Sequence, residues 1–337
     1  MNTLKGLPNL GNTCYINTAL QCLFSCNSFV HFLLSNTIIY NKSTLVSHLQ
    51  HICKIDTLNK DLVSKYEDLL KYISVTFNDF NVHEHNDIHE FLLILLDKLT
   101  IEFGYKIDPI LFAEKETQHL LRVMNRNDKL LKFSQKCNNK WFQILQNEHS
   151  SFIDLFCGLW VNQIICGNCH KIHQNYELFK DIEIDISNDT LVECLETHFK
   201  DSSLNVTEDE NQWKCDSCNK KCNSLKFIKI FRLPKILIIS LKRFEIMKNR
   251  LKKIHKCVDI PDTIDVKDFV IQNTYAKNTC YNLKAVANHM GNIYGGHYTA
   301  SCKPKDKIYN INDEHIKHLS EYNHTNSYLL FYELTHL

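Results

Sequence analysis

Near the start of the chain stands the sequence Gly6-Leu7-Pro8-Asn9-Leu10-Gly11-Asn12-Thr13-Cys14-Tyr15-Ile16-Asn17. From Ile16 onward apolar residues recur at helical spacing, so we expect a helix that begins beside Cys14, after a turn at 11–13 that can cap it. A free thiol is only about 3% thiolate at pH 7, and a helix N-terminus favours the thiolate. The amides there, with Asn9 or Asn12, could also hold an oxyanion. Cys14 is therefore a candidate nucleophile; a buried structural thiol is the alternative, since the chain has 15 cysteines.

The composition is that of an ordinary globular protein with a hydrophobic core. The 337 residues are 44% apolar, and 39 lysines and arginines nearly balance 38 aspartates and glutamates. A net charge of +1 gives no general attraction to nucleic acid or to an anionic membrane. The chain opens without a secretory leader, and its apolar runs are too short to span a bilayer. We therefore expect an intracellular protein, cytoplasmic or nuclear, whose reduced cysteines serve as metal ligands, nucleophiles or core residues.

Helical patterns dominate the first third of the chain, and strand patterns the second half. The clearest helix runs over 88–99 and opens with Asp87, with Glu90 three residues later as in a capping box. Residues 104–150 and 245–275 are polar and weakly patterned, so we expect connecting or peripheral structure there. Strands are predicted by apolar, β-branched and aromatic residues at 236–239, 283–287, 297–302, 307–311 and 327–332. This separation of helices from a mostly antiparallel sheet predicts an α+β fold.

A candidate general base lies in the sequence Tyr294-Gly295-Gly296-His297-Tyr298-Thr299. Its two glycines allow positive φ and let a substrate chain lie close to the loop beside the histidine. A histidine base needs a partner that orients its second ring nitrogen. Asn312 and Asp313, which follow the predicted strand at 307–311, are candidates for that partner. The alternative is a histidine at a strand edge, one of 18 in the chain.

Two cysteine pairs with the same spacing, Cys166-x2-Cys169 and Cys215-x2-Cys218, predict a metal site. Each pair can form a knuckle, and two knuckles complete a tetrahedral set of thiolates for which Zn²⁺ is the expected ion. Four cysteines leave no open position, so the zinc would be structural. Its binding energy, on the order of 10 kcal/mol or more, would hold together an insert with little core of its own. Reduced surface cysteines are the alternative.

Six segments, in order along the chain, resemble motifs of the ubiquitin-specific protease family. Residues 6–17 look like its cysteine box and 295–300 like its histidine box, with further matches at 86–92, 154–158, 241–244 and 328–332. The resemblance implies one catalytic domain over 1–337 with a papain-like thumb, palm and fingers. Its expected parts are a helical thumb over about 1–150, zinc-bearing fingers over about 151–245 and a palm sheet with the catalytic histidine over about 246–337.

The resemblance also implies a role for each site residue. By motif position Cys14 is the nucleophile, His297 the base, Asn312 the orienting third member and Asn9 the oxyanion donor. Because neighbouring strand residues face opposite sides, Ile311 should point into the core and Asn312 toward the active site. Asp313 would then lie behind Asn312 rather than against His297. Replacing Asp313 should therefore lower the rate less than replacing Asn312.

The implied reaction is hydrolysis of the isopeptide or peptide bond after the C-terminal Gly-Gly of ubiquitin. The implied partners are ubiquitin or ubiquitinated proteins, with Asp87, Glu90 and Tyr298 against the ubiquitin tail. The family usually has two glutamines before the aspartate, where this chain has His85 and Asn86. We expect a monomer that binds neither nucleic acid nor membranes.

Three other functions fit parts of the sequence. A protease-like scaffold could bind ubiquitin without cleaving it, although it would have no need of Cys14, His297 and Asn312. A zinc ribbon could bind nucleic acid, but the cysteine segment lacks a basic aromatic stripe. A protease for another ubiquitin-like modifier that ends in Gly-Gly is the third alternative, which the sequence leaves open.

Overall fold

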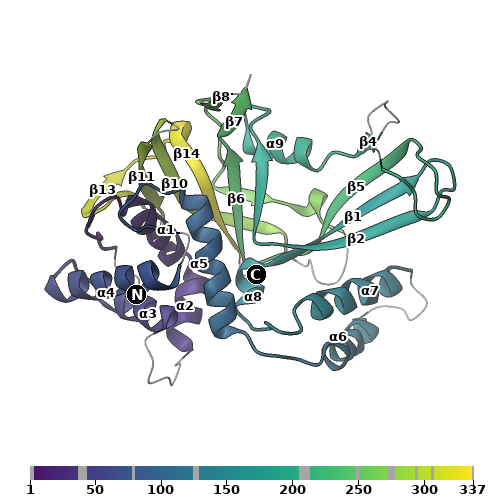
Figure 1. Cartoon of the computed structure of the whole chain (residues 1–337), viewed down its shortest axis with the longest axis horizontal. Helices are drawn as coiled ribbons and strands as arrows, with labels where there is room; N and C mark the ends of the chain where they lie inside the picture. Colours follow the sequence, from purple (N-terminus) through teal and green to yellow (C-terminus); the bar gives the residue numbers. More distant parts are fainter. Residues whose placement is uncertain are drawn as a thin grey trace.

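The structure consists of a helical thumb, a central palm sheet and a projecting fingers sheet, with the fingers at the opposite end from the thumb (Figure 1). This computed structural model describes residues 4–36, 44–77, 80–123, 129–204, 213–247, 250–271, 278–292, 295–304 and 307–335. Tyr294 of the predicted base motif lies outside these residues. Across the described ranges, no helix is both long and apolar enough to cross a membrane. The combination of helices and largely antiparallel sheets confirms the predicted α+β class.

The thumb is built around one helix that is buried along its whole length. Every residue of α1 (Cys14–Ser25) is buried, because helices α2 and α5 and palm strands β10 and β11 pack around it. Its N-terminus, which carries Cys14, therefore lies where the thumb meets the palm. The other thumb helices are α2 (Asn27–Ser35), α3 (Leu45–Lys54), α4 (Lys60–Thr76), α5 (Ile88–Phe103) and α8 (Ile153–Phe156).

The palm is an eight-stranded sheet with apolar side chains on both faces. Its strand order is β13-β12-β11-β10-β14-β6-β3, and β9 also pairs with β10; only β3 and β6 are parallel. Alternate residues of β6 enter two different cores, which explains its continuous apolar run. The strands are β3 (Asp181–Asp185), β6 (Ile236–Lys242), β9 (Thr263–Asp265), β10 (Cys280–Asn292), β11 (Gly295–Cys302), β12 (Ile308–Asn312), β13 (His315–Leu319) and β14 (Ser327–Leu334).

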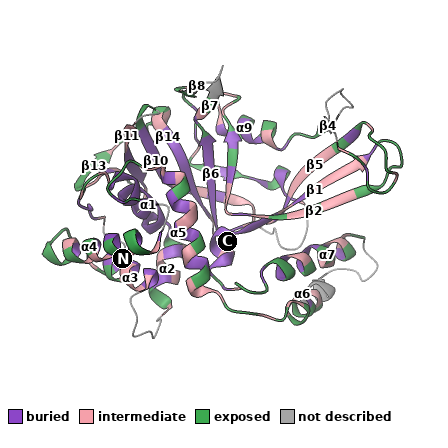
Figure 2. Cartoon of the chain, in the orientation of Figure 1, coloured by how far each residue is buried: buried purple, intermediate pink, exposed green. Residues whose placement is uncertain are grey.

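The fingers are a separate antiparallel sheet of order β2-β1-β5-β4. Its strands are β1 (Gly158–Cys166), β2 (Ile172–Phe179), β4 (Ser202–Leu204) and β5 (Ser224–Arg232). Strand β2, for example, is far less buried than palm strand β6, as the colours of Figure 2 show. Within the segment of about 151–245 expected to form the fingers, β3 and β6 belong to the palm sheet. After α8 the chain forms β1 and β2 of the fingers and then β3 of the palm. It returns to the fingers as β4 and β5 and enters the palm again as β6.

Residues 104–150 form a helical hairpin rather than merely connecting structure. Helices α6 (Pro109–Val123) and α7 (Lys129–Ile144) pack together, and Trp141 and Phe142 enter a core at the base of the fingers. The helical pattern is weak in the sequence because Ser134 and Asn138 occupy buried positions on α7. The smaller elements are β7 (Phe244–Met247), β8 (Arg250–Lys253), α9 (Leu191–His198) and the 3-10 turns Lys267–Phe269 and His324–Asn326.

Candidate active site

Cys14 occupies the first position of α1, at the end of a turn that Asn9 holds in place. Gly11 (φ 96°) and Asn12 (φ 56°) adopt left-handed conformations in that turn. The Asn9 Oδ1 accepts hydrogen bonds from the backbone N–H groups of Gly11 (3.2 Å) and Thr13 (3.3 Å). Thr13 precedes the helix, and its side chain makes no capping bond, so the cap predicted from residues 11–13 is not formed by a side chain. The thiol thus lies at the N-terminus of a helix.

His297 lies on β11, in a hairpin whose close backbone approach requires glycine. Met290 of β10 pairs with His297, and Gly291 pairs with Gly296. Gly291 has φ 119°, and a Cβ on Gly296 would lie 2.2 Å from the His289 Nε2. The two glycines therefore allow β10 and β11 to approach closely beside the histidine.

The structure brings His297 between Cys14 and Asn312. The His297 Nε2 lies 2.6 Å from the Asn312 Oδ1, which accepts a hydrogen bond from it. A hydrogen bond with Cys14 is the largest cause that raises the pKa of His297 to about 9. Burial opposes this pKa shift, while Asn312 and the charges of Cys14 and Asp313 favour it. Ile311 is buried in the core as expected, which leaves Asn312 on the side of the histidine.

Asp313 links the end of β12 to the cysteine loop. It adopts a left-handed conformation (φ 49°), and its carboxylate accepts hydrogen bonds from Asn9 Nδ2 (2.9 Å) and Asn17 Nδ2 (2.7 Å). Its Oδ2 lies 3.9 Å from the His297 Nε2. Asp313 therefore contacts the predicted oxyanion donor directly, which the sequence did not indicate. Asn17 was also missed, although a buried asparagine one helical turn after Cys14 is a signal that could have pointed to it.

Asp87 lies at the start of α5 and meets two tyrosines of the palm. Its Oδ1 caps the helix by accepting from the backbone of His89 (2.7 Å) and Glu90 (3.2 Å), as the sequence predicted. Its Oδ2 accepts from the hydroxyl groups of Tyr328 (3.0 Å) and Tyr298 (3.4 Å). Of the three residues expected against the substrate tail, Asp87 and Tyr298 are hydrogen-bonded to each other, and Glu90 is exposed. Tyr328 joins this group through its hydrogen bond to Asp87.

An aromatic cluster continues from Tyr298 and Tyr328. The His289 ring lies 4.7 Å from Tyr298 and 5.6 Å from Phe244, and Phe244 lies 5.8 Å from Tyr328. Burial, with the charge of Lys253, lowers the pKa of His289 to about 4, so its ring is neutral at pH 7. These rings thus pack together beside the glycine hairpin.

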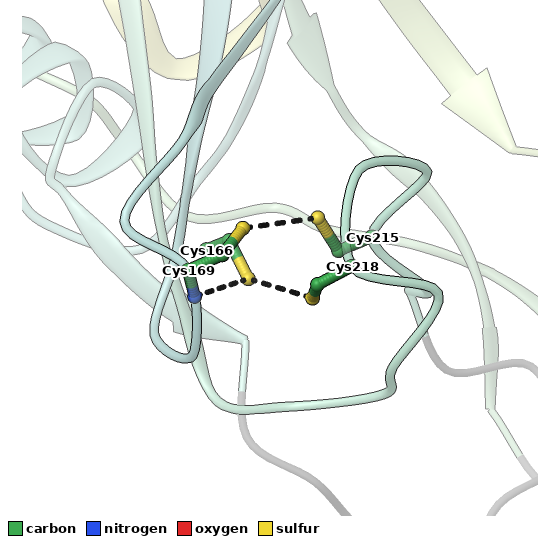
Figure 3. A group of neighbouring side chains, drawn as sticks. All are labelled: Cys166, Cys169, Cys215 and Cys218. Atoms are coloured by element: carbon green, nitrogen blue, oxygen red, sulfur yellow. Dashed lines mark hydrogen bonds between the residues drawn. The ribbon is translucent and has the colours of Figure 1, made fainter.

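The two cysteine pairs form a group of four thiols at the tip of the fingers (Figure 3). All four sulfur atoms lie within 4.8 Å of one another. The Cys166–Cys218 and Cys169–Cys215 sulfur distances are 3.8 and 3.6 Å. Ligands at about 2.3 Å from a tetrahedral ion are about 3.8 Å apart, so this group could hold a metal ion.

The backbone supports the same conclusion, because both pairs form the same knuckle. His170 N–H bonds to Cys166 O, as Asn219 N–H does to Cys215 O. His170 and Asn219 both have left-handed φ, of 56° and 59°. Repeated geometry of this kind turns both sulfur atoms of each pair toward one point.

Two further residues contact these thiols and were missed by the spacing rule. The Cys222 Sγ lies 3.2 Å from the Cys166 Sγ, and the His173 Nε2 lies 3.2 Å from the Cys215 Sγ. Both can donate a hydrogen bond to a thiolate. A third CxxC spacing is absent, so only the fold reveals them.

A second group could also bind a cation. His89, Asp181 and Glu183 lie within 4.8 Å of one another. His89 and Asp181 already form a 2.8 Å contact that joins α5 to β3. Burial lowers the pKa of His89, but the contact with Asp181 outweighs it and the pKa is raised. This contact accounts for the group without an ion.

Comparisons with known proteins agree with this geometry. The model of the family described as ubiquitin carboxyl-terminal hydrolase matches residues 5–332. Ubiquitin carboxyl-terminal hydrolase 21 of Bos taurus is 28% identical over 358 residues, covering 98% of this chain and 61% of the relative. Ubiquitin carboxyl-terminal hydrolase 2 of Bos taurus is 29% identical over 354 residues, covering 98% of this chain and 55% of the relative. This chain thus spans less than two thirds of the length of either relative.

Among solved structures, a chain in the SAGA Ubp8/Sgf11/Sus1/Sgf73 DUB module bound to ubiquitin aldehyde has the same fold. The TM-score is 0.75 at 22% identity, and the match covers 100% of this chain and 70% of that chain. The family match spans all the motifs predicted from the sequence, from the cysteine box to the final strand. The chain belongs to the ubiquitin carboxyl-terminal hydrolase family.

Proposed function

We propose that this protein is a cysteine-dependent deubiquitinase that hydrolyses the bond after the C-terminal Gly-Gly of ubiquitin. The observation that carries the proposal is the position of His297, which makes hydrogen bonds with both Cys14 and Asn312. A histidine so placed can take a proton from a thiol and keep its orientation. The glycine hairpin and aromatic walls beside it suit a substrate tail without side chains.

The reaction proceeds through a thioester. His297 takes the proton of Cys14, and the thiolate attacks the carbonyl carbon of the terminal glycine. The oxyanion accepts hydrogen bonds from the backbone N–H of Cys14 and from one side-chain N–H of Asn9. The second side-chain N–H of Asn9 keeps its hydrogen bond to Asp313. Protonated His297 then gives its proton to the leaving lysine amine. Finally His297 activates the water that hydrolyses the thioester.

Asp87 and Tyr298 are proposed to bind the ubiquitin tail, together with Glu90. Asp87 and Tyr298 are hydrogen-bonded to each other beside the active site, while the exposed carboxylate of Glu90 is free to meet a basic residue of the tail. We place the enzyme inside the cell, in the cytoplasm or nucleus, where ubiquitin conjugates occur. A monomer suffices for this chemistry, because every proposed catalytic residue lies in one chain.

We also propose that Cys166, Cys169, Cys215 and Cys218 bind one structural Zn²⁺. Their sulfur distances fit the edges of a tetrahedral thiolate site, and four thiolates leave no position for substrate. When bound, the ion would cross-link the tips of β1 and β5. It takes no part in the proton transfers above.

The decisive experiment is reaction with ubiquitin carrying a C-terminal electrophile, followed by mass mapping of the adduct. We expect one adduct, on Cys14, and none in Cys14→Ala, which should lose isopeptidase activity but still bind ubiquitin. Cys257→Ala, which removes an exposed cysteine, is the control and should react as the wild type does. Cleavage by Cys14→Ala at a tenth of the wild-type rate or more would refute the assignment.

The same probe separates the two remaining functions. A non-catalytic scaffold would bind ubiquitin without forming the adduct. A protease for another Gly-Gly modifier would react faster with that modifier carrying the same electrophile than with the ubiquitin probe.

A further inference from the structure

A buried lysine lies close to the catalytic hairpin. Lys253, at the end of β8, is only 6% exposed. Its Nζ donates hydrogen bonds to the backbone carbonyl groups of His289 (2.7 Å) and Gly291 (3.1 Å) on β10. These two residues flank Met290 along β10, and Met290 pairs with His297 on β11 across the hairpin.

The charge of Lys253 is not compensated by a carboxylate. Burial lowers the pKa of Lys253, and the neighbouring charge of Arg243 lowers it further. No acidic group within the described part of the chain contributes to its pKa or forms an ion pair with it. Burying a cation without a counter-ion is costly, so the two carbonyl groups are what stabilises it there.

These carbonyl groups lie where the palm sheet loses a strand. Strand β14 pairs with β10 only as far as Asn288, opposite Ser327. From His289 to its end at Asn292, strand β10 pairs only with β11 in the described sheet. An open edge presents unpaired backbone groups, and the ammonium of Lys253 bonds to two of them in place of the missing strand.

The hairpin at this point has little room for adjustment. A Cβ on Gly291 would lie 2.5 Å from the Gly296 Cα. A shift of β10 at Gly291 is therefore transmitted directly to Gly296, the residue before His297. The 2.6 Å contact between His297 and Asn312 depends on that position.

We propose that Lys253 is a positioning residue for His297. Its ammonium group holds the outer edge of β10 at His289 and Gly291, and thereby fixes the backbone that sets His297 between Cys14 and Asn312. This inference rests on the proposed function of the active site. The substrate does not need to touch Lys253 for the effect to operate.

The test replaces Lys253 by methionine, which keeps the aliphatic stem and removes the ammonium group. Lys252→Met is the matched control, because Lys252 is the exposed neighbour on the same strand. We expect Lys253→Met to lower kcat on a ubiquitin substrate at least tenfold. We expect its Kd for ubiquitin, measured in the Cys14→Ala background, to change less than twofold. Lys253→Arg, which keeps a donor at this place, should recover part of kcat.

The pH profile supplies a readout that a general loss of stability would not move. Cys14 on α1 and Asp313 after β12 are the titratable groups that face His297, and contact with them raises its pKa. If the hairpin loosens, these contacts weaken, and the alkaline limb of the kcat profile should move to lower pH in Lys253→Met. Lys252→Met should keep the wild-type limb.

The outcomes separate this inference from the proposed function. If wild-type protein fails to react with the ubiquitin electrophile, the proposed function fails. If wild-type protein reacts and Lys253→Met keeps kcat within twofold, or loses ubiquitin affinity instead, the positioning role is refuted. Should Lys253→Met not fold, Lys253→Gln, which can still donate to one carbonyl, takes its place. Failure of both to fold would make Lys253 a residue of general stability and would also refute the proposal.

Discussion

Replacing Asn312 by alanine removes the oxygen that lies 2.6 Å from the His297 Nε2. During the reaction His297 carries a positive charge, and a hydrogen bond to a charged group is worth about 1.5–3 kcal/mol. Since about 1.36 kcal/mol corresponds to a tenfold change in rate, kcat should fall about 10- to 150-fold. Asn312→Asp keeps an acceptor at the same position and should retain much of the rate.

The assay is steady-state cleavage of a ubiquitin substrate with a fluorogenic leaving group. KM should change little in Asn312→Ala, because Asn312 orients the base rather than binding the tail. Thermal unfolding of both variants shows whether the fold is intact. A folded Asn312→Ala with at least half of the wild-type kcat would refute the assignment, as would an Asn312→Asp variant that is as slow as the alanine variant.

Three further predictions concern Asp313, the metal site and the pH dependence of stability. Asp313→Ala should lower kcat at least tenfold, more than the sequence suggested, because its carboxylate holds Asn9; kinetics within threefold of wild type would contradict this. The purified chain should contain about one zinc by metal analysis, Cys166→Ser should lose it, and Cys222→Ser should keep it but release it faster to a chelator. Metal loss in Cys222→Ser would instead make Cys222 a ligand. The pKa of His297 is raised from about 6.5 to about 9, so its stabilising effect is complete below about pH 6.5 and is lost as the pH rises through about 9. The melting temperature should therefore fall between pH 7 and 9.5 in wild type and less in Cys14→Ala, and equal slopes would argue against the Cys14–His297 contact.

The parts of the site that depend on short-range patterns could be predicted from the sequence. The helix after Cys14, the cap at Asp87 and the burial of Ile311 follow from periodicity and alternation over a few residues. The two cysteine knuckles follow from a spacing that recurs in the chain. In each case the relevant neighbours are close in sequence, so the local pattern carries the information.

Contacts between distant segments could not be predicted in the same way. Asp313 is 304 residues from Asn9 and 296 from Asn17, and nothing in the local sequence of either segment marks the other as its partner. In the sequence Lys253 simply follows another lysine, Lys252. Its ammonium group is buried against carbonyl groups of β10 that lie beyond the start of β14 at Ser327, a contact that the local sequence does not reveal. Helix α7 could not be predicted for a local reason, because its buried face includes the polar residues Ser134 and Asn138, which weaken the apolar pattern.

The position of Asp313 explains why nucleophile and base cannot be considered separately. In its left-handed conformation, its backbone carbonyl accepts the N–H of Leu7 (3.0 Å) while its carboxylate binds Asn9 and Asn17. Beside it, a Cβ on Gly6 would lie 2.4 Å from the backbone oxygen of Glu314, so the two segments are in direct backbone contact.

One of the junctions between the thumb and the palm thus lies immediately after Asn312. The thumb supplies Cys14 and Asn9, and the palm supplies His297 and Asn312. A movement that separates residues 6–9 from 313–314 would displace Asn9, the proposed oxyanion donor, and open the thiol–imidazole contact together. The catalytic group therefore forms only when the thumb and the palm are fully packed, which links the integrity of the fold directly to the proposed chemistry.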